Sequence, residues 1–168
     1  GWTLDGLSRA WLSMQLNPDN KEKYISTIES LFINGEMSEL VALYGSLPLL
    51  AHPEAWTKRC AEGIRSNIGE VLESVICNNP FPSEVLDELA WNQLVLKAIF
   101  TEKPLLQIVG LKERMNERLA RSLSDYAHER WAAHRDLNPL VWICVAPFIG
   151  PHNFSDIERI FHSDSALE

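Results

Sequence analysis

Cysteine is scarce in this chain, and the few cysteines lie far apart. The 168 residues include three of them, Cys60, Cys77 and Cys144. Because the number is odd and no CxxC pair occurs, neither a disulfide framework nor a zinc ribbon is indicated. Reduced, buried thiols are typical of a cytoplasmic protein. We therefore expect a cytoplasmic protein with no bound metal ion.

Basic residues are also in short supply. Lys and Arg total 15 against 23 Asp and Glu, so the formal net charge is −8. A field of this sign repels phosphate backbones, and the affinity of proteins for nucleic acids rests largely on cationic contacts to phosphate. We therefore expect no nucleic-acid partner.

Long hydrophobic runs and cofactor motifs are absent as well. The longest nearly apolar stretch, residues 139–150, has twelve residues, whereas a membrane-spanning helix needs about 20. That stretch is typical of a buried core segment, and we expect no membrane span. The sequence has no glycine-rich phosphate loop, no GxSxG elbow and no Cys–His nucleophile arrangement. We expect no cofactor.

Strand signals are missing, and the hydrophobic pattern is helical almost throughout. No Asn-Gly or Asp-Gly turn separates alternating runs. Apolar residues instead recur every three or four positions, as they do in amphipathic helices. The composition, 46% apolar and 23% charged, is that of a globular protein. We predict one all-α, multi-helical domain over residues 1–168, with about eight or nine helices in an α-solenoid-like superhelix or an orthogonal bundle.

Breakers and capping residues set the expected helix boundaries. Ser38 and Ser83 are expected to cap helices, and Ser155 is expected to form a capping box with Glu158. Near Ser66 the chain either continues or kinks. The pattern predicts helices over residues 4–14, 24–32, 38–47, 53–64, 71–76, 83–100, 112–134, 138–145 and 155–161.

The segment 112–135 is cationic within an acidic protein. It holds six Lys or Arg and four acidic residues, a net charge of +2. Guanidinium groups suit carboxylate and phosphate, so this basic segment is a candidate site for an anionic ligand. The alternative is a solvated helix face with i,i+4 ion pairs, such as Arg121 with Asp125.

Asp125, His128 and Glu129 lie together in this segment. Asp125 and His128 are three residues apart and so share one helix face. This spacing suits a metal ligand pair or a carboxylate that orients an imidazole for acid/base catalysis. However, position 132 is Ala, so the HExxH zinc motif is absent, and no second carboxylate-x-x-His follows. The alternative is an ordinary surface hydrogen bond.

Arg130 lies on the apolar stripe of the same predicted helix, and Asn116 and His134 point the same way. A charge on that stripe must be paired or must line a cleft, because burying it alone is costly. We interpret Arg130 as a candidate ligand contact. The alternative is an arginine whose stem passes the edge of the core.

Polar residues interrupt another nearly all-apolar helix, the one predicted to end at residue 100. Asn92, Gln93 and Lys97 fall within it and need partners inside the protein. Arg65 and Asn67, near the expected kink, are further members of the same network. These five residues are candidate ligand contacts, since a few convergent polar groups orient ligands in pockets. A structural network explains them equally well.

Several short blocks resemble a known family. Ala-Trp-Asn-Gln and Asp-Tyr-Ala-His-Glu-Arg-Trp-Ala-Ala, in this order, are the most specific. The sequence resembles the EboA domain family from about Trp2 to Phe148, in the blocks 65–67, 79–82, 90–93, 96–98, 110–111, 125–133 and 147–148. Ser66 and Phe81 stand where Thr and Tyr are usual in the family, and His134 replaces a small residue.

The resemblance implies a context more than a mechanism. Genes of this family lie in a bacterial secondary-metabolite cluster, with neighbours that look like a prenyltransferase, a metal-dependent hydrolase, sugar-isomerase-like and dehydroquinate-synthase-like proteins. The cluster is tied to making or exporting a small metabolite. The resemblance also implies that further N-terminal helices precede residue 1. It carries over no catalytic residue.

Three hypotheses follow from the sequence. In the first, a non-enzymatic accessory protein holds a polar or anionic metabolite, or a partner enzyme of the same gene cluster, in a cleft between the helices 83–100 and 112–134. In the second, Asp125, His128 and Glu129 serve an acid/base or metal-dependent enzyme, and His128 opens into a pocket. In the third, the chain is a helical scaffold whose apolar groove receives another cluster protein.

Overall fold

The computed structural model describes residues 2–151 and 153–162, and these residues form an all-α fold. The helices are α1 (Leu4–Met14), α2 (Lys21–Asn34), α3 (Met37–Gly45), α4 (Thr57–Arg65), α5 (Gly69–Ile76), α6 (Phe81–Val85), α7 (Glu88–Phe100), α8 (Glu117–Ala132), α9 (Val141–Val145) and α10 (Phe154–Phe161). Short 3-10 turns occur at Leu47–Leu49, Pro53–Ala55, Leu105–Gln107 and Ala146–Phe148. The predicted fold class is confirmed. The described residues form ten α-helices, one more than the larger predicted number, because α6 and α7 replace the single helix predicted over residues 83–100.

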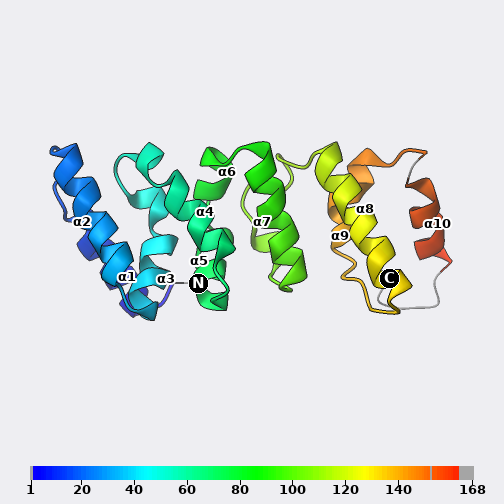
Figure 1. Ribbon diagram of the computed structural model, residues 1–168, viewed down its shortest axis with the longest axis horizontal. Coiled ribbons are helices and arrows are strands. Elements are labelled where there is room, and N and C mark those ends of the chain that lie inside the picture. Colours follow the sequence, from blue (N-terminus) through cyan, green and yellow to red (C-terminus); the bar gives the residue numbers. More distant parts are fainter. Residues whose placement is uncertain (1, 152, 163–168) are drawn as a thin grey trace.

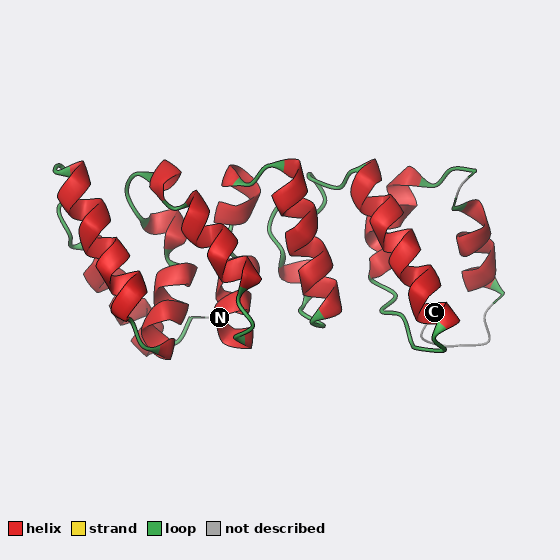
Figure 2. Ribbon diagram, viewed as in Figure 1, coloured by secondary structure: helices red, strands yellow, loops and turns green. Residues whose placement is uncertain are grey.

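The helices stand side by side in one elongated row, which begins with α1 and α2 and ends with α10 (Figure 1). α1 packs on α3, and α3 packs on α5. Further along, α4 contacts α5, α7 contacts α8, and α8 contacts α9. For the described residues, Figure 2 shows only helices and loops along this row. Packing of each helix mainly on its neighbours is the arrangement of a solenoid, the first of the two predicted architectures.

A continuous hydrophobic core runs along the row. Its largest fully buried side chains include Trp56, Trp91 and Phe81. The indole N–H of Trp56 donates to the carbonyl oxygen of Ala51 at 2.7 Å. This bond satisfies the polar atom of a side chain that is otherwise entirely apolar and buried.

The helix predicted over residues 83–100 is in fact two helices, α6 and α7. Asp87 accepts a hydrogen bond from the backbone N–H of Ala90 at 2.8 Å and thereby caps α7. Ser83 lies inside α6, where its hydroxyl donates to the carbonyl oxygen of Pro80. The prediction that Ser83 begins one long helix is therefore wrong.

Arg114 stabilises the break between α6 and α7. Its guanidinium donates to the carbonyl oxygens of Ser83 at 2.9 Å and Leu86 at 2.8 Å. The end of α6 leaves such carbonyls without helical partners. The same guanidinium lies over the ring of Trp91, 4.7 Å from its centroid. This member of the basic segment thus holds the fold together.

Other helix starts also differ from those predicted: α2, α4, α5 and α9 begin at Lys21, Thr57, Gly69 and Val141 rather than at 24, 53, 71 and 138. α8 begins after its N-cap Asn116, not at Lys112. α3 begins with a capping box formed by Glu36 and Glu39 rather than with Ser38. In both cases a side chain away from the expected start satisfies the free N–H groups of the first turn.

The chain breaks between α4 and α5, where the sequence is compatible with either a continuous helix or a kink. The backbone N–H of Ile68 donates to the hydroxyl of Ser66 at 3.1 Å. α5 then packs against α4, and the contact is very close at Gly63. A Cβ at this position would lie 2.6 Å from Cγ2 of Val75 in α5 and 2.7 Å from Cε1 of Tyr44 in α3. Only a glycine fits between these two side chains.

We expect Gly63→Ala to destabilise the fold. The added methyl overpacks the contact, at a cost of about 1–3 kcal/mol, and the better helix propensity of Ala returns at most about 1 kcal/mol. Thermal unfolding should show a melting temperature lower by several degrees. Gly6→Ala is the matched control, because its Cβ would meet only side-chain atoms at 3.2 Å or more. A Gly63→Ala variant as stable as the parent would refute the close contact.

Candidate functional site

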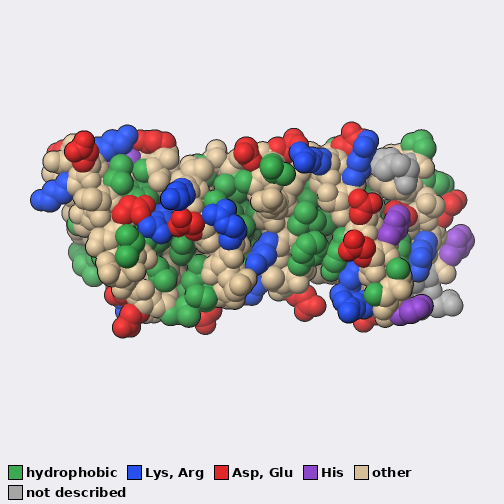
Figure 3. All heavy atoms as spheres, viewed as in Figure 1, with side chains coloured by type: hydrophobic (Ala, Val, Ile, Leu, Met, Phe, Trp, Pro, Cys, Tyr) green, Lys and Arg blue, Asp and Glu red, His purple; other side chains and the backbone are tan. Residues whose placement is uncertain are grey.

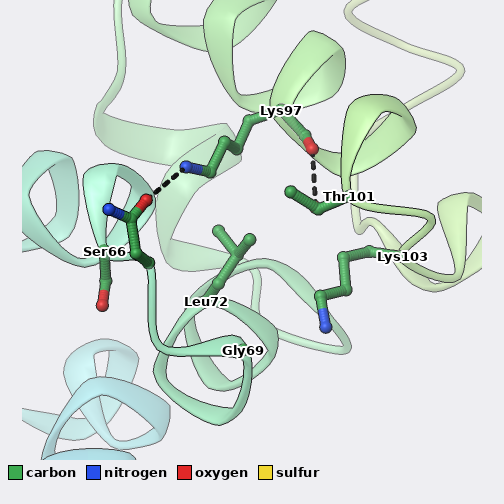
Figure 4. Close-up of a pocket in the computed structure, with 7 residues that line it drawn as sticks. Ser66, Gly69, Leu72, Lys97, Thr101 and Lys103 are labelled. Atoms are coloured by element: carbon green, nitrogen blue, oxygen red, sulfur yellow. Dashed lines mark hydrogen bonds between the residues drawn. The ribbon is translucent and has the colours of Figure 1, made fainter.

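A small open pocket lies where the α4–α5 connection meets the end of α7. Its lining residues come from three segments of the chain, and Figure 4 shows them around the cavity. The cavity measures about 160 Å³. The lining residues are Ser66, Asn67, Gly69, Leu72, Lys97, Thr101 and Lys103. Two of the predicted ligand contacts, Asn67 and Lys97, therefore lie in one pocket.

Lys97 supplies a positive charge to this pocket. Its ammonium group donates to Oδ1 of Asn67 at 3.3 Å. Among the described residues, no carboxylate oxygen lies within 4.0 Å of this ammonium. The side chain is half-buried on α7, and its own backbone carbonyl accepts from the hydroxyl of Thr101 at 2.7 Å. An ammonium held this way has room for an anionic partner.

Lys103 and the start of α5 complete the pocket. The Lys103 ammonium pairs with Glu73 at 2.6 Å. It also lies next to Gly69, because a Cβ on that glycine would come within 3.2 Å of it. No side chain of the described residues caps α5, so its first N–H groups are free to bind another acceptor. Neither Lys103 nor Gly69 was among the residues predicted from the sequence.

The other predicted ligand contacts lie elsewhere. Asn92 is buried and forms a reciprocal amide pair with Asn116, with N–O distances of 3.1 and 2.8 Å. Arg130 donates to the backbone carbonyl of Asp136 at 2.8 Å, beyond the end of α8. Gln93 and Arg65 are exposed. Of the six predicted ligand contacts, the structure therefore brings together only Asn67 and Lys97.

Two side-chain contacts join α7 and α8, the helices between which the sequence predicted a cleft. The Asn92–Asn116 pair joins the two helices. The rings of Phe100 and Tyr126 meet further along, with centroids 4.8 Å apart. The pocket at Lys97 instead faces the α4–α5 connection.

His128 has a carboxylate partner, but it is not the predicted one. Nε2 of His128 lies 2.6 Å from Oδ1 of Asp156 in α10. Asp125 and Glu129 are exposed. The expected pairing of Asp125 with His128 is therefore wrong, because α10 places a buried carboxylate closer. α10 begins at Phe154, so position 155 lies within its first turn rather than at its cap.

The imidazole of His128 lies largely at the surface. Its side chain is 54% exposed, and it does not line the pocket at Lys97. Ser124, one turn earlier, is buried, and its hydroxyl makes no hydrogen bond with the imidazole. The described residues contain no group of three His, Cys, Asp or Glu side chains placed to hold a metal ion.

The alternative interpretation of the basic segment, a solvated helix face with i,i+4 ion pairs, holds for part of it. Arg121 pairs with Glu117 at 2.6 Å in an exposed i,i+4 bridge, rather than with Asp125. Such exposed pairs contribute little to stability. Arg114, Arg121 and Arg130 are half of the six basic residues of this segment, and each of the three has a partner within the protein.

A second, larger groove lies between α1, α2 and α3, where sequence reasoning predicted no site. It measures about 350 Å³. Leucines form most of its apolar wall, and the ion pair of Arg9 with Glu39, at 3.1 Å, lies at its rim. The apolar stripe on residues 4–16, which is wider than one buried helix face needs, is the signal that could have indicated it. Its lining residues are Arg9, Leu12, Ser13, Leu16, Thr27, Leu31, Asn34, Gly35, Glu39, Ala42 and Leu43.

The three cysteine thiols have raised pKa values, which disfavour the nucleophilic thiolate form. Burial raises the pKa of Cys60 to about 12 and that of Cys144 to about 11. Burial also raises the pKa of Cys77, which is only partly covered. At neutral pH all three are therefore thiols rather than the reactive thiolates.

We expect Cys60 and Cys144 to resist alkylation in the folded protein. Iodoacetamide at mildly alkaline pH should modify Cys77 first, because that thiol alone of the three is partly exposed, and should leave the other two unmodified. Peptide mass spectrometry after a time course measures each site. In concentrated guanidinium all three should react at similar rates, since unfolding removes the burial that raises their pKa. Rapid native alkylation of Cys60 would contradict this arrangement.

Comparison with known proteins identifies the family. No curated protein and no solved structure matches the chain. In the part that the structure describes, no helix has the length and apolar character needed to span a membrane. A family model described as "Metabolite traffic protein EboA" matches residues 1–146. This match covers most of the chain and includes both the pocket at Lys97 and the apolar groove, so the protein belongs to the EboA family.

Proposed function

We propose that this EboA protein is a non-catalytic accessory protein of metabolite traffic that holds the anionic group of a small molecule. The binding site is the pocket of Asn67, Lys97 and Lys103. The compartment we expect is the bacterial cytoplasm, and the proteins that deliver or receive the molecule are products of the same secondary-metabolite gene cluster.

The observation that carries this proposal is the ammonium of Lys97. The half-buried Arg114 and Arg130 also lack a carboxylate partner among the described residues, but they donate to backbone carbonyl oxygens, whereas the ammonium of Lys97 lines an open pocket. It donates instead to the neutral amide oxygen of Asn67. An incoming carboxylate or phosphate gains a charge-assisted hydrogen bond from it without displacing an ion pair.

The size and lining of the pocket limit the ligand. A cavity of about 160 Å³ corresponds to roughly five water molecules at about 30 Å³ each. It therefore admits an anionic head group, and the rest of the molecule remains outside. The two lysines and Glu73 together give a net charge of +1, so a single negative group is neutralised in place.

The lining also argues against catalysis in this pocket. Its titratable side chains are the two lysines, and no carboxylate, imidazole or thiol of the described residues lines it. General acid/base chemistry needs a group whose pKa lies near the operating pH. Binding with subsequent release is the activity that such a lining supports.

On the face shown in Figure 3, charges of both signs are interspersed, so long-range attraction of an anion to this face is weak.

We expect inorganic phosphate and acetate to bind at this pocket and Lys97→Gln to weaken the binding. In ¹⁵N NMR titrations at constant ionic strength, the amide signals of Gly69, Glu70 and Val71 should shift and saturate. Loss of one charge-assisted hydrogen bond, about 1.5–3 kcal/mol, should raise the dissociation constant about 10- to 100-fold.

The matched control for this titration is Lys58→Gln. Lys58 is a lysine on α4 that lines neither the pocket nor the groove, so this variant changes the net charge equally and should bind as the parent does. Equal weakening in both variants would show general electrostatics instead of a site. Unchanged binding by Lys97→Gln would overturn the proposal.

A further inference from the structure

The two lysines of the pocket have different partners. The ammonium of Lys103 pairs with the carboxylate of Glu73 at 2.6 Å, whereas that of Lys97 donates to the neutral amide oxygen of Asn67 at 3.3 Å. Figure 4 shows Leu72 between the two lysine side chains. Among the described residues, the pocket therefore combines one cation that an acid neutralises with one cation that has no counter-charge.

Glu73 lies one helical turn after the start of α5. Residues four apart on a helix are neighbours, with about 5–6 Å between their Cβ positions, so Glu73 stands beside the position of Gly69. The Lys103 ammonium is close to both, because a Cβ on Gly69 would come within 3.2 Å of it. The Lys103 side chain is only 17% exposed, which leaves this ammonium little room to move away. An anion at the first N–H groups of α5 therefore lies close to the carboxylate of Glu73.

No third cation of the described residues lines this pocket. Arg65, at the end of α4, is exposed and lies outside the lining. Glu70 directly follows Gly69 and Glu102 directly precedes Lys103, and both acids are exposed. The charges of the pocket thus match one negative charge on a ligand. A second negative charge would have no counter-charge, and an uncompensated charge in a partly buried site is costly.

We propose that the pocket selects a group with a single negative charge, such as a carboxylate, over a doubly charged phosphate monoester, and that Glu73 sets this selectivity. The inference rests on the proposed function and names the chemical class of its ligand. A phosphate monoester carries close to two negative charges above about pH 7, because its second pKa is about 6, whereas a carboxylate carries one. Doubly charged anions still bind through Lys97 and the N–H groups of α5, but less tightly.

Glu73→Gln is expected to change the affinity for the two kinds of anion by different factors. The substitution removes an acid and leaves the Lys103 ammonium without its partner. The electrostatic energy of this change is proportional to the charge of the ligand, so the factor for a dianion is the square of that for a monoanion. Because Glu73 is 49% exposed, solvent screening keeps the gain for a monoanion to about threefold, which corresponds to about tenfold for a dianion.

Methyl sulfate and methyl phosphate are the matched probes, since they have the same shape and differ by one charge at about pH 8. In ¹⁵N NMR titrations at constant ionic strength, followed at the amides of Gly69, Glu70 and Val71, the parent should bind methyl sulfate several-fold more tightly than methyl phosphate. Acetate should also bind more tightly than methyl phosphate. Glu73→Gln should bind methyl phosphate about tenfold and methyl sulfate about threefold more tightly than the parent does.

Glu113→Gln is the matched control. Glu113 is an exposed acid before α8 that lies outside the pocket lining, so its loss changes the net charge equally and should leave the preference of the parent unchanged. A parent that prefers methyl phosphate would overturn the selectivity, and an equal gain for both probes in Glu73→Gln would overturn the role of Glu73. Either result would leave the proposed function intact, whereas failure of all three probes to bind would overturn that function and this inference together.

Discussion

The close contact of three helices around Gly63 is the constraint on which the candidate site depends. Val75 of α5 and Tyr44 of α3 approach the α4 backbone so closely that a Cβ there would lie under 3 Å from both. This contact holds α5 against α4 directly after the break at residues 66–68. The break exposes the uncapped start of α5, where Lys103 lies next to Gly69, and Lys97 of α7 donates to Asn67 within the break. Without the α4–α5 contact, the residues that line the pocket would have no reason to meet.

Local signals in the sequence were sufficient for the fold class and for most helix ends. Hydrophobic periodicity and the lack of strand signals predicted an all-α chain, and the row of helices agrees. The errors arose where a distant residue decides a local feature. Arg114 satisfies the carbonyls at the end of α6, which lets Asp87 begin a new helix. A serine within α6 was therefore mistaken for the start of the whole segment.

The candidate site was predictable only in part, for the same reason. Asn67 and Lys97 were noticed because polar residues interrupt an apolar pattern, and such interruptions need partners. Lys103 and Gly69 carry no such signal, since a lysine or a glycine near a helix end is ordinary. Likewise, the carboxylate next to His128 lies 28 residues further along the chain, so sequence spacing selected a nearer one. The polar residues of the apolar helix thus had two different outcomes: Asn92 forms a structural amide pair, whereas Lys97 faces a cavity.

The proposed function depends on the binding of an anion by Lys97 and the first N–H groups of α5. Tungstate is a heavy-atom substitute for phosphate, and crystals grown with it would show its position in an anomalous difference map. We expect the strongest peak in the pocket, with a tungstate oxygen about 3 Å from Nζ of Lys97. A map with tungstate at other surface lysines, an empty pocket and Lys97 still bonded to Asn67 would contradict it.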